Sequence, residues 1–154
     1  MFTSTAKFSD AGELALRCEE GEKTHTYCDT RGIQTIGVGH THNAPSHVPF
    51  FTGSIWTQAM IDAVFRADLA PIITAANRDL TAPVSQCQFD ALISLEYNIG
   101  MGGLRSSHVV NVINHHGVDA VTETDFLAWA HPSQLKGRRE REWAMFSRGV
   151  YRTA

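Results

Sequence analysis

Along most of this chain, apolar residues recur every three or four positions, which is the spacing of an amphipathic helix. Thr57 caps the longest such pattern, which predicts a helix over 57–78 that is kinked or divided at Pro71, because proline removes a backbone donor. A capping-box pair, Ser85 with Gln88, opens a core helix that should stop at the glycine-rich stretch after residue 99. Further helices are expected at about 9–20, 107–115, 122–130 and 137–148.

One short region near the amino end follows a strand pattern instead. Two β-favouring runs, 24–28 and 33–38, flank the sequence Asp-Thr-Arg-Gly at 29–32, which favours a tight turn because Asp bonds its own backbone and Gly accepts a positive φ. We therefore expect an antiparallel hairpin, preceded by a helix that ends at Glu20 with Gly21 just after its last turn. The predicted fold class is α+β, mainly helical, with one small antiparallel sheet.

This arrangement would bring three polar side chains into one small volume: Glu20 at the helix end, Asp29 at the turn and Thr35 on the returning strand. Paired carboxylates are the equipment of glycoside hydrolases, in which one donates a proton to the leaving oxygen and the other stays ionised. We interpret Glu20 as the general acid and Asp29 as the ionised partner. The alternatives are structural: Glu20 would cap the helix, although acids are unfavourable at that end, and Asp29 would shape the turn.

The spacing of Glu20, eight residues, Asp29, five residues and Thr35 resembles the catalytic signature of the phage-type lysozymes (endolysins, glycoside hydrolase family 24). The run Thr-Ile-Gly-Val-Gly-His-Thr at 35–41 also matches that family's pattern, although Val38 stands where an aromatic residue or isoleucine is often found. Two later segments, 88–100 and 136–146, are similar to the family's central helix and to its C-terminal helix.

The resemblance implies a lysozyme-like fold of two lobes with an active-site cleft between them. The β-rich lobe would comprise about 21–57, and the helical lobe about 72–154 together with helix 9–20. A helix at 57–78 would link the two lobes. It implies a peptidoglycan hydrolase that cleaves the β-1,4 bond between N-acetylmuramic acid and N-acetylglucosamine with inversion, Thr35 holding the attacking water against Asp29. No cofactor and no metal are expected. The implied setting is the host bacterial cytoplasm, until a partner holin opens the membrane and the enzyme reaches the cell wall in the periplasm.

The resemblance also implies supporting residues. Arg138 is expected to contact Glu20. His40 is expected to form an ion pair with Asp68 between the lobes, which would raise the pKa of His40 because a nearby carboxylate favours the charged imidazole.

Two features of the sequence leave alternatives open. Glu96 and Asn98 lie on the central helix, and Asn98 is expected to bind substrate. Glu96 is either a second acid candidate or a groove-lining residue or, in the interpretation that we favour, a partly exposed surface glutamate. Phe51 or Trp56 would stack on a sugar or, as we favour, pin a loop to the core.

Composition narrows the classes of function. At 154 residues with 43% hydrophobic and 19% charged residues, the chain is expected to be one globular domain and a monomer. A formal charge of −3 gives no general attraction to nucleic acid, whereas six Lys/Arg against two Glu over 136–152 would suit an anionic wall polymer or a solvated helix. No signal peptide, membrane span or stable membrane insertion is expected.

Three cysteines, an odd number, make an obligatory disulfide framework improbable, although Cys18 and Cys28 are close enough in sequence to pair. Two other functions remain open. A lytic transglycosylase would cut the same bond without water and would need only the glutamate. A non-catalytic wall-binding module would keep the fold alone. Asp29 and Thr35 argue against both.

Overall fold

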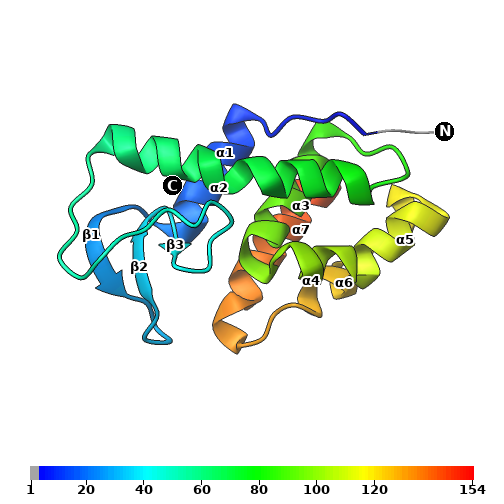
Figure 1. The fold of residues 1–154 in the computed structure, drawn as a ribbon. Coiled ribbons are helices and arrows are strands. Elements are labelled where there is room, and N and C mark those ends of the chain that lie inside the picture. The colour runs from blue at the N-terminus through cyan, green and yellow to red at the C-terminus, as the bar shows by residue number, and fades with distance from the viewer. Residues whose placement is uncertain (1–3) are drawn as a thin grey trace. The chain divides into compact units, whose positions relative to one another are not determined.

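A computed structural model describes residues 4–154, and these fall into two compact units (Figure 1). One unit comprises residues 17–71, and it contains the whole of the sheet. The other comprises the described residues up to Leu16 together with Ile72–Ala154, and its regular structure is helical. The predicted fold class is confirmed: the chain is α+β and mainly helical, with one small antiparallel sheet.

The sheet has three antiparallel strands in the order β1-β2-β3. They are β1 (Lys23–Cys28), β2 (Gln34–Gly37) and β3 (His40–Thr41). The expected hairpin joins β1 to β2 around a turn in which Gly32 has φ +77°, and Tyr27 pairs with Thr35 across it. The third strand was not predicted, because two residues are too few to show a strand pattern.

Apolar side chains from the irregular segment after β3 complete the core of this unit. Trp56 is only 6% exposed and packs so closely on β2 that a Cβ at Gly37 would lie 3.2 Å from its ring. Phe51, in contrast, is 72% exposed. The interpretation that these aromatic residues pin a loop to the core therefore holds for Trp56 and is wrong for Phe51.

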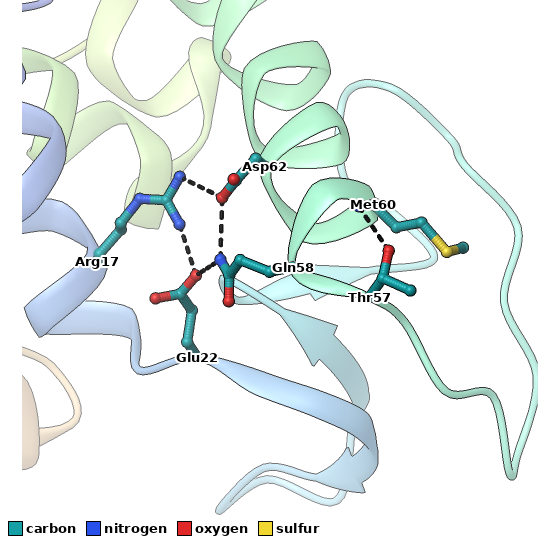
Figure 2. Close-up of polar contacts among 6 residues, drawn as sticks. All are labelled: Arg17, Glu22, Thr57, Gln58, Met60 and Asp62. Atoms are coloured by element: carbon teal, nitrogen blue, oxygen red, sulfur yellow. Dashed lines mark hydrogen bonds and ion pairs between the residues drawn. The ribbon is translucent and has the colours of Figure 1, made fainter.

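Two helices, α1 (Asp10–Glu20) and α2 (Gln58–Asp79), each begin directly after a capping residue, which for α2 is Thr57 as expected. The Ser9 hydroxyl accepts from the Gly12 amide at 3.0 Å, and the Thr57 hydroxyl accepts from the Met60 amide at 3.2 Å (Figure 2). Of the two effects expected at Pro71, a division of the helix is wrong, because α2 runs through it as one helix, and a kink stays a prediction. Buried neighbours on both sides, such as Leu69 and Ile72, offset the hydrogen bond that proline removes.

The helical unit is built around α3 (Gln86–Ile99), which packs against α7 (Lys136–Arg148) (Figure 1). The remaining elements of this unit are α4 (Met101–Arg105), α5 (His108–His116), α6 (Glu123–Leu127) and the short 3-10 turns Val118–Ala120 and Ser133–Leu135. The Ser85–Gln88 capping box is present, and α3 stops at Gly100 as expected.

One short helix in this unit was not predicted, and one predicted helix boundary is wrong. The glycines after residue 100 lie in the short helix α4, which buries Leu104. The helix α6 ends at Leu127 rather than at about residue 130. Among the residues that the structure describes, no helix is long and apolar enough to cross a membrane. Cys18, Cys28 and Cys87 are free thiols, so the conceivable Cys18–Cys28 bridge is not formed.

Candidate active site

Glu20 is the last residue of α1, where the sequence analysis expects the general acid. Gly21, at φ +71°, turns the chain out of the helix, and its amide donates to the Arg17 carbonyl at 2.9 Å. The Glu20 side chain is half-buried and lies against Gly39, the residue before β3. A Cβ at Gly39 would lie 2.4 Å from a Glu20 carboxylate oxygen, so the carboxyl group occupies the space that any other residue at 39 would need.

Asp29 lies at the start of the hairpin turn, and its backbone carbonyl accepts from the Gly32 amide at 2.9 Å. Its Oδ1 atom accepts from the amides of Arg31 at 2.8 Å and Ile33 at 2.9 Å. The hydrogen bond from the Ile33 amide is the largest cause that holds the pKa of Asp29 below its ordinary value, and the Arg31 amide and guanidinium add to it. Asp29 therefore shapes the turn and stays ionised at neutral pH, so its structural and chemical uses are compatible.

Thr35 is in the central strand β2, pairing with Tyr27 on one side and Thr41 on the other. The side chain is buried, at 3% exposure, and its hydroxyl donates to the Ile33 carbonyl at 3.0 Å. The hydroxyl hydrogen is thereby used, which leaves lone pairs of the oxygen to accept a hydrogen bond. Thr35 is thus equipped to receive a hydrogen from a water molecule rather than to act as a nucleophile.

Tyr27, which was not among the predicted site residues, is acted on by the charges of both carboxylates. Burial raises the pKa of its phenol, and the charges of Glu20 and Asp29 raise it further. Both carboxylates therefore lie within electrostatic range of one side chain, which is the cross-strand partner of Thr35. The sequence held a signal for this position, because Tyr27 precedes Asp29 by only two residues, on the strand that leads into the turn.

The predicted pair of His40 and Asp68 is present. The His40 Nδ1 atom is 2.7 Å from Asp68 Oδ2, and its Nε2 atom is 2.8 Å from the Val48 carbonyl oxygen. Burial alone would lower the pKa of His40, but the hydrogen bonds to Asp68 and Val48 and the charge of Asp68 outweigh it and raise the pKa. Because a carboxylate and a carbonyl oxygen are both acceptors, this environment favours the charged imidazole, in which both ring nitrogens donate.

This ion pair joins β3 to α2 inside the unit of residues 17–71. The expectation that it would link two lobes is therefore wrong. Asp68 also accepts from the Ser46 amide at 3.0 Å through its second oxygen, so the pair fixes the loop that follows β3. It holds the chain just beyond Gly39, against which Glu20 lies.

Three predicted site residues belong to the helical unit: Arg138, Asn98 and Glu96. Arg138 is 6% exposed, and it donates to Glu142 and to the Ser94 carbonyl, both at 3.0 Å. Asn98 is exposed, and its side-chain oxygen accepts from Arg139. The predicted contact of Arg138 with Glu20 and the predicted substrate contact of Asn98 stay predictions.

Glu96 differs most from its expected environment. Its side chain is 0% exposed, and neither carboxylate oxygen has a hydrogen-bond partner among the described residues. Burial raises the pKa of Glu96 to about 8, the charge of Asp79 raises it further, and Arg78 opposes the shift. The favoured interpretation, a partly exposed surface glutamate, is therefore wrong. Glu96 keeps a proton at neutral pH, but with no exposed surface it is a poorer candidate for proton donation than Glu20.

Comparison with known proteins identifies the family and the fold of this chain. The sequence model of the phage lysozyme family matches residues 17–142. The endolysin of Salmonella phage P22 is 35% identical over 144 residues, which cover 91% of this chain and 97% of that protein. The solved endolysin of Escherichia coli O157:H7 phage FAHEc1 has a TM-score of 0.87 at 27% identity and covers 98% of this chain and 99% of its own.

A second solved structure is the muramidase domain of SpmX from Asticaccaulis excentricus. Its TM-score is 0.76 at 30% identity, covering 92% of this chain and 97% of that one. These similarities span nearly the whole chain, and the family match includes the segment that carries Glu20, Asp29 and Thr35. The α+β fold described above is therefore lysozyme-like, and the chain belongs to the phage lysozyme family, as an enzyme of the lysozyme (muramidase) class.

Proposed function

We propose that this lysozyme is an endolysin that hydrolyses the β-1,4 bond between N-acetylmuramic acid and N-acetylglucosamine in bacterial peptidoglycan. Membership of the phage lysozyme family supports peptidoglycan as the substrate and lysis of the host as the outcome. The observation that carries the residue assignments is the common neighbour Tyr27, on which the charges of both Glu20 and Asp29 act. No cofactor enters the proposed reaction.

Glu20 is the proposed general acid. A glycosidic oxygen is a poor leaving group until it is protonated, and a positioned carboxylic acid can supply that proton as the bond breaks. The close approach of Glu20 to Gly39 supports this role, because the absence of a side chain at residue 39 leaves space for the carboxyl group beside β3. A proton donor held in one place needs no reorganisation when the substrate binds.

Asp29 and Thr35 are the proposed water-binding pair. A water molecule can donate one hydrogen to the ionised Asp29 carboxylate and the other to the Thr35 oxygen, whose own hydrogen is bound to Ile33. Its lone pair is then free to attack the anomeric carbon, while Asp29 accepts the proton and stabilises the positive charge that develops on the sugar. Attack on the face opposite the leaving group inverts the anomeric configuration.

The remaining predicted residues, apart from Glu96, have supporting roles in this proposal. Arg138 would contact Glu20, and Asn98 would bind the sugar chain. The His40–Asp68 pair would hold the strand that follows Gly39. Glu96 has no part in the reaction, because its carboxyl group is wholly buried.

The proposed biological setting is phage-induced lysis. The chain would accumulate in the host cytoplasm and reach the wall in the periplasm after a holin permeabilises the membrane. Expression in a host without a holin should leave the culture intact, and a membrane-permeabilising agent should then trigger rapid clearing. Spontaneous lysis without the agent would contradict the dependence on a holin.

The decisive assay is the release of reducing ends from purified peptidoglycan. Wild type should release ends that borohydride converts to muramicitol, and Glu20→Gln, Asp29→Asn and Thr35→Ala should each lose at least about 100-fold in rate. Glu140→Gln is the control, because Glu140 is an exposed glutamate on α7. NMR of the first product should show the α-anomer. Anhydro-muramic ends would instead identify a transglycosylase, and binding without release would identify a wall-binding module.

A further inference from the structure

Four polar side chains form a closed set of contacts beside the end of α1: Arg17, Glu22, Gln58 and Asp62 (Figure 2). We call this set the Arg17 cluster. The Arg17 guanidinium donates to Glu22 at 2.5 Å and to Asp62 at 3.0 Å. The Gln58 amide nitrogen donates to the same two carboxylate oxygens, at 2.9 Å and 3.0 Å. Each carboxylate oxygen therefore receives both an arginine and a glutamine hydrogen.

The places of these residues in the chain give the cluster its significance. Arg17 stands three residues before Glu20 on α1, and Glu22 stands two residues after it. Gln58 and Asp62 lie one turn apart at the beginning of α2. Both flanks of Glu20 are thus fastened to one rigid helix, within the unit of residues 17–71.

An isolated ion pair on a protein surface contributes little to stability. The Arg17 cluster differs from such a pair in two respects. The Arg17 side chain is only 17% exposed, with its guanidinium carbon 4.7 Å from the centre of the Phe65 ring. The planar guanidinium group of Arg17 also binds two carboxylates at once, which the compact ammonium group of a lysine would do less well. The pKa of Asp62 is lowered, first by the hydrogen bond from Gln58 and then by Arg17, as expected for a carboxylate held in place.

Glu20 needs such fixing because of its location. A helix end frays unless its neighbours are tied down, and Glu20 is the last residue of α1. On its other side, the carboxyl group already fills the space over Gly39. Fraying of the last turn would move the proton donor relative to the Asp29 side of the site, and a misplacement of about 1 Å costs catalysis on the order of 100-fold.

We propose that the Arg17 cluster is a positioning element for the Glu20 carboxyl group. Arg17 and Gln58 are positioning residues, which act through Glu20 and not on the substrate. This inference rests on the assignment of Glu20 as the general acid under the proposed function.

The test compares two soluble muropeptide-chain substrates that differ in their leaving group. One has the natural sugar alcohol, which needs protonation by the acid. The other has a dinitrophenolate, which leaves without it. Arg17→Met removes the guanidinium and keeps a chain over Phe65. Gln58→Ala changes an exposed residue and keeps helix propensity, so it reports even where Arg17→Met folds poorly. Arg105→Met, at an exposed arginine on α4, is the matched control.

With the natural leaving group, Arg17→Met should lose about 10-fold to 100-fold in kcat at unchanged KM, and Gln58→Ala about threefold to tenfold. With dinitrophenolate both variants should fall within about twofold of wild type, as should Glu20→Gln. Arg105→Met should match wild type on both substrates.

Equal losses on the two substrates would show a merely structural role and overturn the proposal, as would no loss on either. The proposed function is judged separately by Glu20→Gln. An inactive Glu20→Gln beside a fully active Arg17→Met refutes the positioning role alone. Wild-type activity in Glu20→Gln on the natural substrate refutes both.

Discussion

Glu96 makes the stability of this protein depend on pH in a direction opposite to that of an ordinary acidic side chain. In the folded state its carboxyl group is wholly buried, and it has no hydrogen-bond partner among residues 4–154. Burial, followed by the charge of Asp79, raises the pKa of Glu96 from 4.5 to about 8. In the unfolded chain the same group is solvated and titrates at its ordinary value.

The magnitude follows from these two values. At pH 4.5 and below, Glu96 is protonated in both states and has no differential effect on folding. Between pH 4.5 and about 8 the folded state holds a proton that the unfolded state has lost, so the free energy of unfolding falls as pH rises. Each pH unit in that window costs about 1.4 kcal/mol, which amounts to about 5 kcal/mol across it. The stability that is present at low pH is lost as pH rises to the folded pKa.

Glu96→Gln isolates this effect, because glutamine has the shape of the protonated acid and does not titrate. We expect the variant and wild type to have similar free energies of unfolding near pH 4.5. At pH 7 the variant should be more stable by about 3 kcal/mol. Urea unfolding at half-unit steps from pH 4.5 to 9 measures the difference, in which the titration of all other groups cancels. Glu140→Gln, at an exposed position, should give a flat difference curve.

A difference in the free energy of unfolding between Glu96→Gln and wild type that does not change with pH would refute the reasoning. So would an NMR titration of wild type in which the Glu96 carboxyl carbon gives a pKa near 4.5. Activity gives a further check. Glu96→Gln should lyse cells as wild type does, since the proposed acid is Glu20. Loss of lysis in a folded Glu96→Gln protein would return Glu96 to the list of acid candidates.

Three further predictions concern other parts of the molecule. Asp68→Asn should destabilise the protein by about 3 kcal/mol below pH 6.5. The loss should become smaller as pH rises through the raised pKa of His40, because the folded state gains stability only from the charged imidazole. Thermal unfolding at pH 5.5 and 9 measures this, and equal losses at both values would contradict it. Gly39→Ala should reduce kcat about 100-fold, since its Cβ would collide with the Glu20 carboxylate. It should also lower the free energy of unfolding by about 1–2 kcal/mol, because residue 39 has φ +63°. Full activity would mean that the carboxyl group has room elsewhere. Ser85→Ala should cost about 1 kcal/mol by removing the capping box of α3 while leaving peptidoglycan hydrolysis unchanged. Urea unfolding and the rate of reducing-end release measure the two effects, and a changed rate would contradict the prediction.

The parts of the fold that follow from local rules could be predicted from the sequence. The turn at Asp29 forms because an aspartate accepts from two following amides, and α3 begins at Ser85 because serine and glutamine satisfy each other's backbone amides. The parts that depend on tertiary burial could not be predicted in this way. Propensity alone breaks α2 at Pro71, yet packing on both sides keeps it whole.

Glu96 shows the same limit at a single side chain. Spacing along α3 identifies an apolar helix, and a glutamate within it is then most simply assigned to the solvated side. Its burial depends on residues that are remote in sequence, among which Arg78 and Asp79 carry charges that reach it. No periodicity within α3 contains that information. The local structure around the candidate residues was more predictable, because Glu20, Asp29 and Thr35 lie within sixteen consecutive residues, at a helix end, a turn and a strand that local patterns predict.

The candidate site is also where the chain departs most from local preference, and the departures explain one another. Glu20 places a carboxyl group at the negative end of a helix, which is unfavourable for stability. Gly37 and Gly39 place two positive-φ residues beside short strands, where glycine weakens pairing. Each exception makes room for a specific group, since Trp56 packs over Gly37 and the Glu20 carboxyl group lies over Gly39. The Arg17 cluster then adds contacts that fasten the residues on both flanks of Glu20 to α2. Residues that are costly locally and compensated by distant contacts are expected where position serves chemistry rather than stability.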